Sequence, residues 1–415
     1  MKIMKVVHIT KLPDGGASWC AMRICHALRE QGIDAEMLLM QGNPASNITI
    51  AEADWLYRKH GNIVVRLFVK ILKLVLRPRF EHLIHQRKHA EKTCKAFFTS
   101  PVTGYTSLAN HPLVKEADVV HLHWISDFVD FPTFFKRVRK PIVWTIHDEN
   151  PGLGGFHYLS HKEEASKEYL RLDKVYENIK RKALEKGNRP HLVAISSYMR
   201  DFFKKSPILR DCPTTLIHNG VDCKAFHSLP KAECRAKLGI PLDKNVFLFS
   251  SYQIEDKRKG LHMLIPALEA LHDDSIILVC LGKYKAVPNT KYIQVRCEGL
   301  VKGSDLLSEY YSAADYFVLS SFQEAFAQTP LEALACGTPV IAFPCSGVPD
   351  LINPTLGVKS DDFTIESLTV AIKKAMTTTY SHEDIRNEVE SRFSYDIIAK
   401  QYIDLYKNCF RRIKK

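Results

Sequence analysis

The chain has 415 residues, of which 46% are hydrophobic and 25% charged, and its formal net charge is +12. This length exceeds what one hydrophobic core normally organises, and the composition excludes a disordered or collagen-like protein. The eleven cysteines are scattered singly, with no C-x-x-C pair and no clustered Cys/His spacing that would indicate a zinc module. Their odd number, without a secretion signal, indicates reduced thiols in a cytosolic compartment. No signal peptide and no run of ~20 apolar residues is present, so we expect a cytoplasmic protein. The length of the chain predicts two domains.

Strands and helices alternate along the first half of the chain. Residues 5–10 read as a strand, 17–30 as a helix and 34–40 as the next strand. Further buried strands are predicted at 118–124, 141–146 and 191–195, and a charge-rich helix at 162–186.

The turn after the first strand contains Asp14, Gly15 and Gly16. Glycines there let the backbone approach an anion at a helix N-terminus, although many strand-to-helix turns contain glycine. The turn lacks the G-x-G-x-x-G pattern, which argues against an NAD or flavin enzyme.

A basic region follows at residues 58–95, with eleven Lys and Arg against two Glu. In residues 63–77 the cations Arg66, Lys70, Lys73 and Arg77 recur at helical spacing, and the other residues are apolar. Such a helix suits a membrane interface with anionic headgroups, and it suits equally a helix buried against the sheet with one wet edge. No recognised nucleic-acid motif accompanies the charge, so we predict no nucleic-acid partner.

The alternation restarts after Asn219, with strands predicted at 246–250, 275–280, 292–295, 316–320 and 339–343. Two such series predict an α/β protein with two Rossmann-like, doubly wound parallel-sheet domains facing a cleft. The predicted domains are 1–218 and 219–394, and a last helix lies in the segment 395–415.

Several histidines lie at or near strand ends. His147 follows the strand 141–146, where an imidazole can contact a sugar hydroxyl, or can simply cap the strand. Trp124 at another strand end is a candidate stacking surface for a sugar acceptor. For His121 and His123 packing is favoured, and His157 and His161 have no third ligand nearby, so we predict no metal site.

Two glutamates eight positions apart stand out in SSFQEAFAQTPLEALACGTPVIAF: Glu324 on a loop and Glu332 on the following helix. Carboxylates can accept from sugar hydroxyls while loop amides and the helix N-terminus face phosphates. The alternative for Glu332 is a capping box with Thr329 as N-cap. It leaves unexplained Glu324 and the small residues around Phe326.

A basic turn, Asp256 to Gly260, follows the strand 246–250. Cations there could neutralise a diphosphate, although a charged surface turn is the commoner outcome. No D-x-D triplet occurs, so we expect no divalent metal to hold the phosphates.

Together these motifs resemble the retaining glycosyltransferases of family 4, which have the GT-B fold with the C-terminal helix crossing back to the N-terminal domain. The two glutamates match the family's E-x7-E signature, which implies that Glu324 binds the donor sugar and Glu332 the ribose. Phe326 and Ala327 would also contact the donor. The departures are Ala325 and Ala327, where the family commonly has Gly.

The resemblance assigns roles to further positions. His147, followed by Asp148 and the run GGFHY, resembles a subgroup that builds bacterial surface polysaccharides, in which it would be the active-site histidine.

Of the remaining matches, Lys259 corresponds to the diphosphate clamp. Gln253 stands where the family has Arg, so Arg258 would supply the second charge. Leu300 would contact the nucleobase, Gly16 the donor and Gly15 the acceptor.

The implied function is metal-independent transfer, without a cofactor, of a sugar from a nucleoside diphosphate to a saccharide hydroxyl. The acceptor would be lipid-linked and the protein peripheral on the cytoplasmic face of the membrane. Two alternatives remain open: a GT-B sugar-nucleotide epimerase, and a non-catalytic nucleotide-sugar-binding protein at the membrane.

Overall fold

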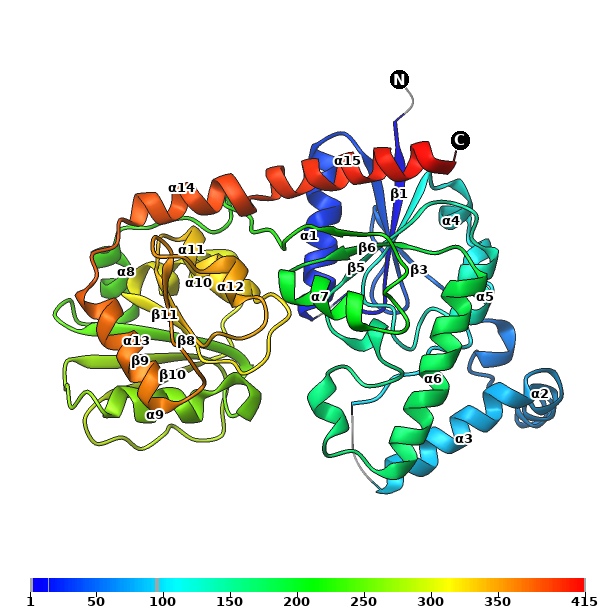
Figure 1. Ribbon diagram of the computed structural model, residues 1–415, viewed down its shortest axis with the longest axis horizontal. Coiled ribbons are helices and arrows are strands. Elements are labelled where there is room, and N and C mark those ends of the chain that lie inside the picture. Colours follow the sequence, from blue (N-terminus) through cyan, green and yellow to red (C-terminus); the bar gives the residue numbers. More distant parts are fainter. Residues whose placement is uncertain (1–2, 14, 94–96, 414–415) are drawn as a thin grey trace. The chain divides into compact units, whose positions relative to one another are not determined.

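The computed structural model describes residues 3–13, 15–93 and 97–413, and the chain divides into two compact units. The first comprises Met1–Ile217 with Ala399–Lys415, and the second His218–Ile398. These bounds lie one residue and four residues from the predicted domain limits. Figure 1 shows one twisted sheet in each unit with helices packed around it.

The first unit is built on a seven-stranded parallel sheet in the order β3-β2-β1-β4-β5-β6-β7. Its strands are β1 (Lys5–Thr10), β2 (Asp34–Leu39), β3 (Ile48–Ile50), β4 (Val119–Leu122), β5 (Ile142–Ile146), β6 (His191–Ala194) and β7 (Thr214–Leu216). Its helices are α1 (Gly16–Glu30), α2 (Ile63–Leu76), α3 (Pro78–Thr93), α4 (Pro112–Glu116), α5 (Phe131–Arg137), α6 (Lys167–Lys186) and α7 (Ser197–Lys205). The chain's last helix, α15 (Tyr395–Ile413), contributes residues from Ala399 onward.

The second unit has a six-stranded parallel sheet in the order β10-β9-β8-β11-β12-β13. Its strands are β8 (Asn245–Gln253), β9 (Ile276–Lys283), β10 (Gln294–Gly299), β11 (Tyr316–Leu319), β12 (Val340–Ala342) and β13 (Gly357–Lys359). Its helices are α8 (Lys231–Leu238), α9 (Leu261–Glu269), α10 (Ser304–Ala313), α11 (Gln328–Ala335), α12 (Val348–Leu351), α13 (Ile365–Thr377) and α14 (His382–Phe393).

In each sheet the chain moves outward from a central strand in one direction and then returns to extend the other side. The reversal falls between β1 and β4 in the first unit and between β8 and β11 in the second. Open α/β sheets bind ligands beyond the carboxyl ends of the strands at this point. The topology therefore selects the segments after β1, β4, β8 and β11.

The central strands are buried on both faces, as expected for a parallel sheet covered by helices. Every residue of β4 and β5 is buried, and in the second unit Phe247 and Leu278 belong to a continuous apolar core. Hydrophobic burial at ~25 cal/mol per Å² is the main stabilising contribution to such a core.

Some local expectations were wrong. The helix predicted from residue 162 begins at Lys167, because the Ser166 hydroxyl caps it by accepting from the Tyr169 amide at 3.4 Å. The alternative in which the basic helix is buried against the sheet is also wrong, because Val69 is the one buried residue of α2.

Candidate functional site

In the second unit the candidate site follows β8 and β11, at the reversal of strand order. A short 3₁₀ turn, Lys257–Lys259, comes directly after β8 and leads through Gly260 into α9. The loop after β11 carries Glu324 and enters α11. These are the two places where the sequence predicted a phosphate clamp and a sugar-binding carboxylate.

The structure brings the two predicted groups into contact. The Lys259 ammonium donates to Glu324 Oε1, and both side chains are only partly exposed. The neighbouring Arg258 extends toward the same loop, its guanidinium 3.4 Å from the Gln323 carbonyl. A cation and a carboxylate held together at a strand-end loop can bind both the phosphate and the hydroxyl end of one ligand.

Gly260 makes this approach feasible. Its φ of +75° favours glycine, and a Cβ there would lie 1.9 Å from the Ser320 carbonyl oxygen at the end of β11. The Ser320 hydroxyl in turn donates to the Lys259 carbonyl at 3.1 Å. The basic turn is therefore fixed against β11.

The loop beyond Glu324 is anchored through its backbone. Phe326 is 6% exposed, stacks on His218 with ring centroids 5.2 Å apart, and accepts at its carbonyl from the Asn219 amide at 3.3 Å. Ala327 is the N-cap of α11 and provides no side-chain cap. Its helix N-terminus therefore presents backbone N–H groups without a competing side chain, the property an anion site requires.

Glu332 is not part of a capping box. Because α11 begins at Gln328 rather than after Thr329, that threonine lies within the first turn and makes no N-cap. Glu332 is 6% exposed and accepts from the Tyr311 hydroxyl at 3.1 Å. Leu300, the predicted nucleobase contact, follows β10 and is 40% exposed.

In the first unit Gly15 and Gly16 form the start of α1 directly after β1. Gly15 is the N-cap with φ +100°, and a Cβ on either glycine would meet nothing within 4 Å. No described atom therefore crowds either glycine. Asp14, which the sequence placed in the same turn, lies outside the described residues.

Trp124 and His147 flank one carboxylate. Asp148, next to His147, accepts from the Trp124 indole at 3.2 Å and from His157 Nδ1 at 2.7 Å. The Lys11 ammonium lies 5.1 Å from the Trp124 ring centroid, so this cation already occupies part of the surface predicted for a sugar.

Behind His147 lies a cluster of buried imidazoles that was not predicted from the sequence. His8 belongs to β1 and His121 to β4, and His123 directly follows β4. The Nδ1 atom of His123 lies 3.2 Å from His147 Nε2. Burial lowers the pKa of His8 to about 3 and that of His147 to about 4, while Asp148 partly opposes the shift at His147. All of them are therefore neutral at pH 7.

Within the described ranges, the cluster of His8, His121 and His123 is the one group of ligand atoms spaced, within 4.8 Å, so that a metal could be held. Both nitrogens of His121 and of His123 already have hydrogen-bond partners in side chains. A metal would have to displace these bonds, and the cluster offers no carboxylate to balance its charge.

The signal for this cluster was present in the sequence as isolated histidines inside apolar strand runs. His8 pairs directly with His121 in the parallel register of β1 and β4. That pairing joins residues more than a hundred positions apart, and sequence periodicity within one strand does not reveal it.

Comparison with known proteins gives the family of this chain. The glycosyltransferase family 4 sequence model matches residues 14–225, about half of the chain, and the model for glycosyl transferases group 1 matches residues 230–392. The chain belongs to glycosyltransferase family 4. Its two Rossmann-like units are those of the GT-B fold.

Individual relatives of this family 4 chain are distant. An uncharacterized glycosyltransferase of Methanocaldococcus jannaschii is 25% identical over 318 residues, which is 71% of this chain and 76% of the relative. The alpha-galactosylglucosyldiacylglycerol synthase of Streptococcus pneumoniae is 28% identical, covering 54% of this chain and 60% of that protein. Here the chain matches less than two thirds of the relative's length.

Among solved structures, HepE of Anabaena in complex with UDP and glucose is 16% identical, with a TM-score of 0.65 over 97% of this chain and 99% of that one. At this identity the likeness establishes the fold of the family 4 chain. Across the described residues, none of the helices has the length and apolar character needed to span a membrane.

Proposed function

We propose that this family 4 glycosyltransferase is a retaining enzyme that transfers a sugar from a nucleoside diphosphate to a saccharide hydroxyl without a divalent metal or other cofactor. The observation that carries the proposal is the contact of Lys259 with Glu324 beside the N-terminus of α11, at the reversal of strand order. The HepE complex with UDP and glucose supports a nucleotide-sugar ligand for this fold.

Each donor group meets a suitable partner in this proposal. Lys259 and Arg258 neutralise the diphosphate, with backbone N–H groups near Ala327 completing its site. As the donor enters, its phosphate oxygens compete with Glu324 for the Lys259 ammonium. Released from Lys259, the Glu324 carboxylate accepts from a sugar hydroxyl.

The remaining donor and acceptor contacts follow the family assignments. Glu332 accepts from the ribose, Leu300 contacts the base, and Phe326 shapes the sugar pocket. In the first unit His147 contacts the donor sugar, with Gly16 near the donor and Gly15 and Trp124 near the acceptor.

The test is a screen of UDP-, GDP- and ADP-sugars for nucleotide release, followed by transfer to saccharide acceptors. Glu324→Ala and His147→Ala should each lower transfer at least about 100-fold, the range for loss of a transition-state contact. Glu366→Ala, at an exposed site on α13, is the control. Full activity in both site variants would contradict the roles, and a free epimerised nucleotide sugar would identify an epimerase.

The stereochemical and metal claims have separate readouts. NMR of the product should show the donor's anomeric configuration, and EDTA should leave the rate unchanged. Inversion, or a rate restored only by added Mg²⁺ or Mn²⁺, would contradict them.

We further propose that the acceptor is lipid-linked and that α2 binds the membrane that carries this acceptor. Eight large apolar side chains of α2 are at least 50% exposed: Ile63, Val64, Leu67, Phe68, Ile71, Leu74, Val75 and Leu76. An apolar surface of this extent marks an interaction site. The glycolipid named for the Streptococcus relative supports this acceptor class.

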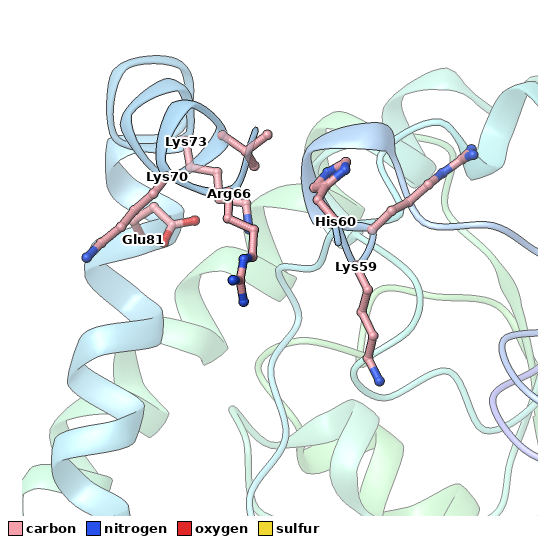
Figure 2. A pocket seen from close by; sticks show the side chains of 8 residues that line it. Lys59, His60, Arg66, Lys70, Lys73 and Glu81 are labelled. Carbon is pink, nitrogen blue, oxygen red and sulfur yellow. The ribbon is translucent and has the colours of Figure 1, made fainter. Parts of the chain in front are cut away.

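The basic residues of α2 face a different side from the exposed apolar ones. Arg66, Lys70 and Lys73 line a cavity of about 450 Å³ together with Arg58, Lys59, His60, Val69 and Glu81. Figure 2 shows Arg66, Lys70 and Lys73 on the α2 side of this cavity and Lys59 and His60 on the facing segment. Arg77, the last cation of the predicted stripe, instead pairs with the buried Asp130 at 3.2 Å.

A cavity with this excess of cations suits a lipid phosphate beside an apolar anchor. Each Lys or Arg near an anionic surface contributes about 1 kcal/mol. Arg66→Gln with Lys70→Gln should therefore weaken sedimentation with phosphatidylglycerol vesicles about thirtyfold. Lys373→Gln with Lys374→Gln, on exposed positions of α13, controls for net charge. Equal sedimentation of all proteins would contradict the membrane role.

A further inference from the structure

A continuous chain of hydrogen bonds runs from the centre of the first sheet to His147. His8 Nδ1 lies 2.9 Å from His123 Nε2, and His123 Nδ1 lies 3.2 Å from His147 Nε2. His8 is 0% exposed and His123 2% exposed. The three rings come from β1, from the end of β4 and from the end of β5, neighbouring strands at the reversal point.

Each ring in this chain is neutral at pH 7 and carries one proton. Burial lowers the pKa values of all three, and the neighbouring His121 and His147 rings lower that of His123 further. The acid next to the chain, Asp148, is bonded to Trp124 and His157. A neutral imidazole has one donor and one acceptor nitrogen, so all three protons must point along the chain in the same direction.

The direction in which these protons point is decided at His8, the inner end of the row of hydrogen bonds. His8 Nε2 is buried and has no hydrogen-bond partner in the described part of the protein. If the protons ran from His147 toward His8, this nitrogen would carry a buried, unpaired N–H group. If the protons run from His8 toward His147, His8 Nε2 instead carries a lone pair that has no donor. Buried N–H donors without an acceptor are the rarer of the two, so the second direction is favoured.

We propose that His8 and His123 are positioning residues that hold His147 as a single tautomer, with its proton on Nδ1 and its Nε2 occupied by the His123 donor. Resting on the proposed function, this makes His147 a constant hydrogen-bond donor to an oxygen of the donor sugar. It also excludes His147 from acting as the base of the reaction, because its lone pair is already engaged.

His121 provides an internal contrast. It is equally buried and lies on the same strand, but its Nε2 bonds to Thr145 at 2.8 Å and its Nδ1 to the Tyr406 hydroxyl of α15 at 2.7 Å. The His121 ring therefore packs against His8 and His123 but takes no part in the hydrogen bonds that link His8, His123 and His147. Removing it should perturb packing and leave the tautomer of His147 unchanged.

The direct test is NMR of the full chain labelled with ¹⁵N-histidine at pH 7.5, without donor. The His147 resonances are assigned by their loss in His147→Gln. We expect a protonated Nδ1 and an unprotonated Nε2. The opposite tautomer at His147, or a stoichiometric transition metal found in the purified protein, would overturn the proposal.

Variants then separate positioning from packing. His123→Leu should convert His147 to a mixture of tautomers and lower transfer about tenfold, the effect of one lost hydrogen bond. His123→Asn, which keeps an N–H near the place of Nδ1, should retain the wild-type tautomer, as should His121→Gln. An unchanged tautomer in His123→Leu would overturn the proposal, and if that variant does not fold, the wild-type and His123→Asn spectra still decide.

The tautomer readout needs no substrate, so it distinguishes this proposal from the proposed function. A correct tautomer in a protein that releases no nucleotide would contradict the enzyme assignment alone. An active enzyme with an Nε2-protonated His147 would contradict the positioning chain alone.

Discussion

Acid should destabilise the first unit because it contains histidines that are buried uncharged. Burial lowers the pKa of His8 from 6.5 to about 3. The folded state therefore binds fewer protons than the unfolded state between these two values. The contribution of His8 to stability is fully present above pH 6.5 and is lost as the pH falls below it.

The size of the effect follows from the two pKa values. Between the unfolded and the folded pKa each such group costs about 1.4 kcal/mol per pH unit, so His8 alone should cost about 2 kcal/mol at pH 5. The pKa values of His121, His123 and His147 are lowered in the same direction. The total loss should therefore exceed that of His8 and take a large part of a typical 5–15 kcal/mol stability.

Urea unfolding followed by tryptophan fluorescence reports on the first unit, because all four tryptophans of the chain precede residue 218. The quantity to compare is the fall in unfolding free energy between pH 7.5 and pH 5. It should be about 2 kcal/mol smaller in His8→Gln than in the wild type, whatever the variant costs at pH 7.5. His26→Gln, at an exposed position of α1, is the control. An equal fall in wild type and His8→Gln would show that His8 does not take up a proton on unfolding.

Three further changes test the remaining features. Lys259→Met should weaken binding of nucleoside diphosphates at least about tenfold by calorimetry, because it removes the cation beside Glu324, and unchanged affinity would contradict the clamp. Gly260→Ala should destabilise the second unit by about 1–3 kcal/mol in thermal unfolding, since the new Cβ collides with Ser320; a wild-type melting temperature would show that the turn relaxes freely. Lys180→Met should lower the free energy of unfolding by about 2–4 kcal/mol, because the buried ammonium donates to two backbone carbonyls. An unchanged free energy in urea unfolding would mean that those carbonyls find other donors.

Most of the fold could be predicted because strands buried on both faces are continuous apolar runs. Of the strands predicted, β1 has the predicted limits and the others differ at one or both ends by up to four residues. The strands not predicted, β3, β7 and β13, have three residues each and lie at or near a sheet edge. Such segments bury too little surface to leave a pattern, and the rest of the sheet recruits them.

The candidate site was predictable where it depends on local order along the chain. Glu324 and Lys259 were found because each lies on the loop or turn that follows a strand. The alternative of an N-cap at Thr329 fails, because the S/T-x-x-E pattern takes no account of where the helix begins, and the N-cap of α11 is Ala327. The contact between Lys259 and Glu324 required knowing that β8 and β11 are neighbours.

The first unit's histidines are not required by the fold, as the second unit shows. At its own reversal point, the register of β8 and β11 pairs the buried, apolar Leu248 and Phe317, and pairs the buried Phe247 with the partly buried Tyr316. The same architecture is therefore stable with hydrocarbon where the first unit has imidazole. Burying an imidazole costs free energy unless its polar atoms are bonded, and one nitrogen of His8 has no partner among the residues that the structure describes. Under the proposed function, selection for binding rather than for stability accounts for this costly arrangement. Under the proposed function, the neutral His147 offers a sugar hydroxyl one uncharged hydrogen bond from Nδ1, because its Nε2 lies against His123. The second unit offers the cations and carboxylates suited to a diphosphate and its sugar.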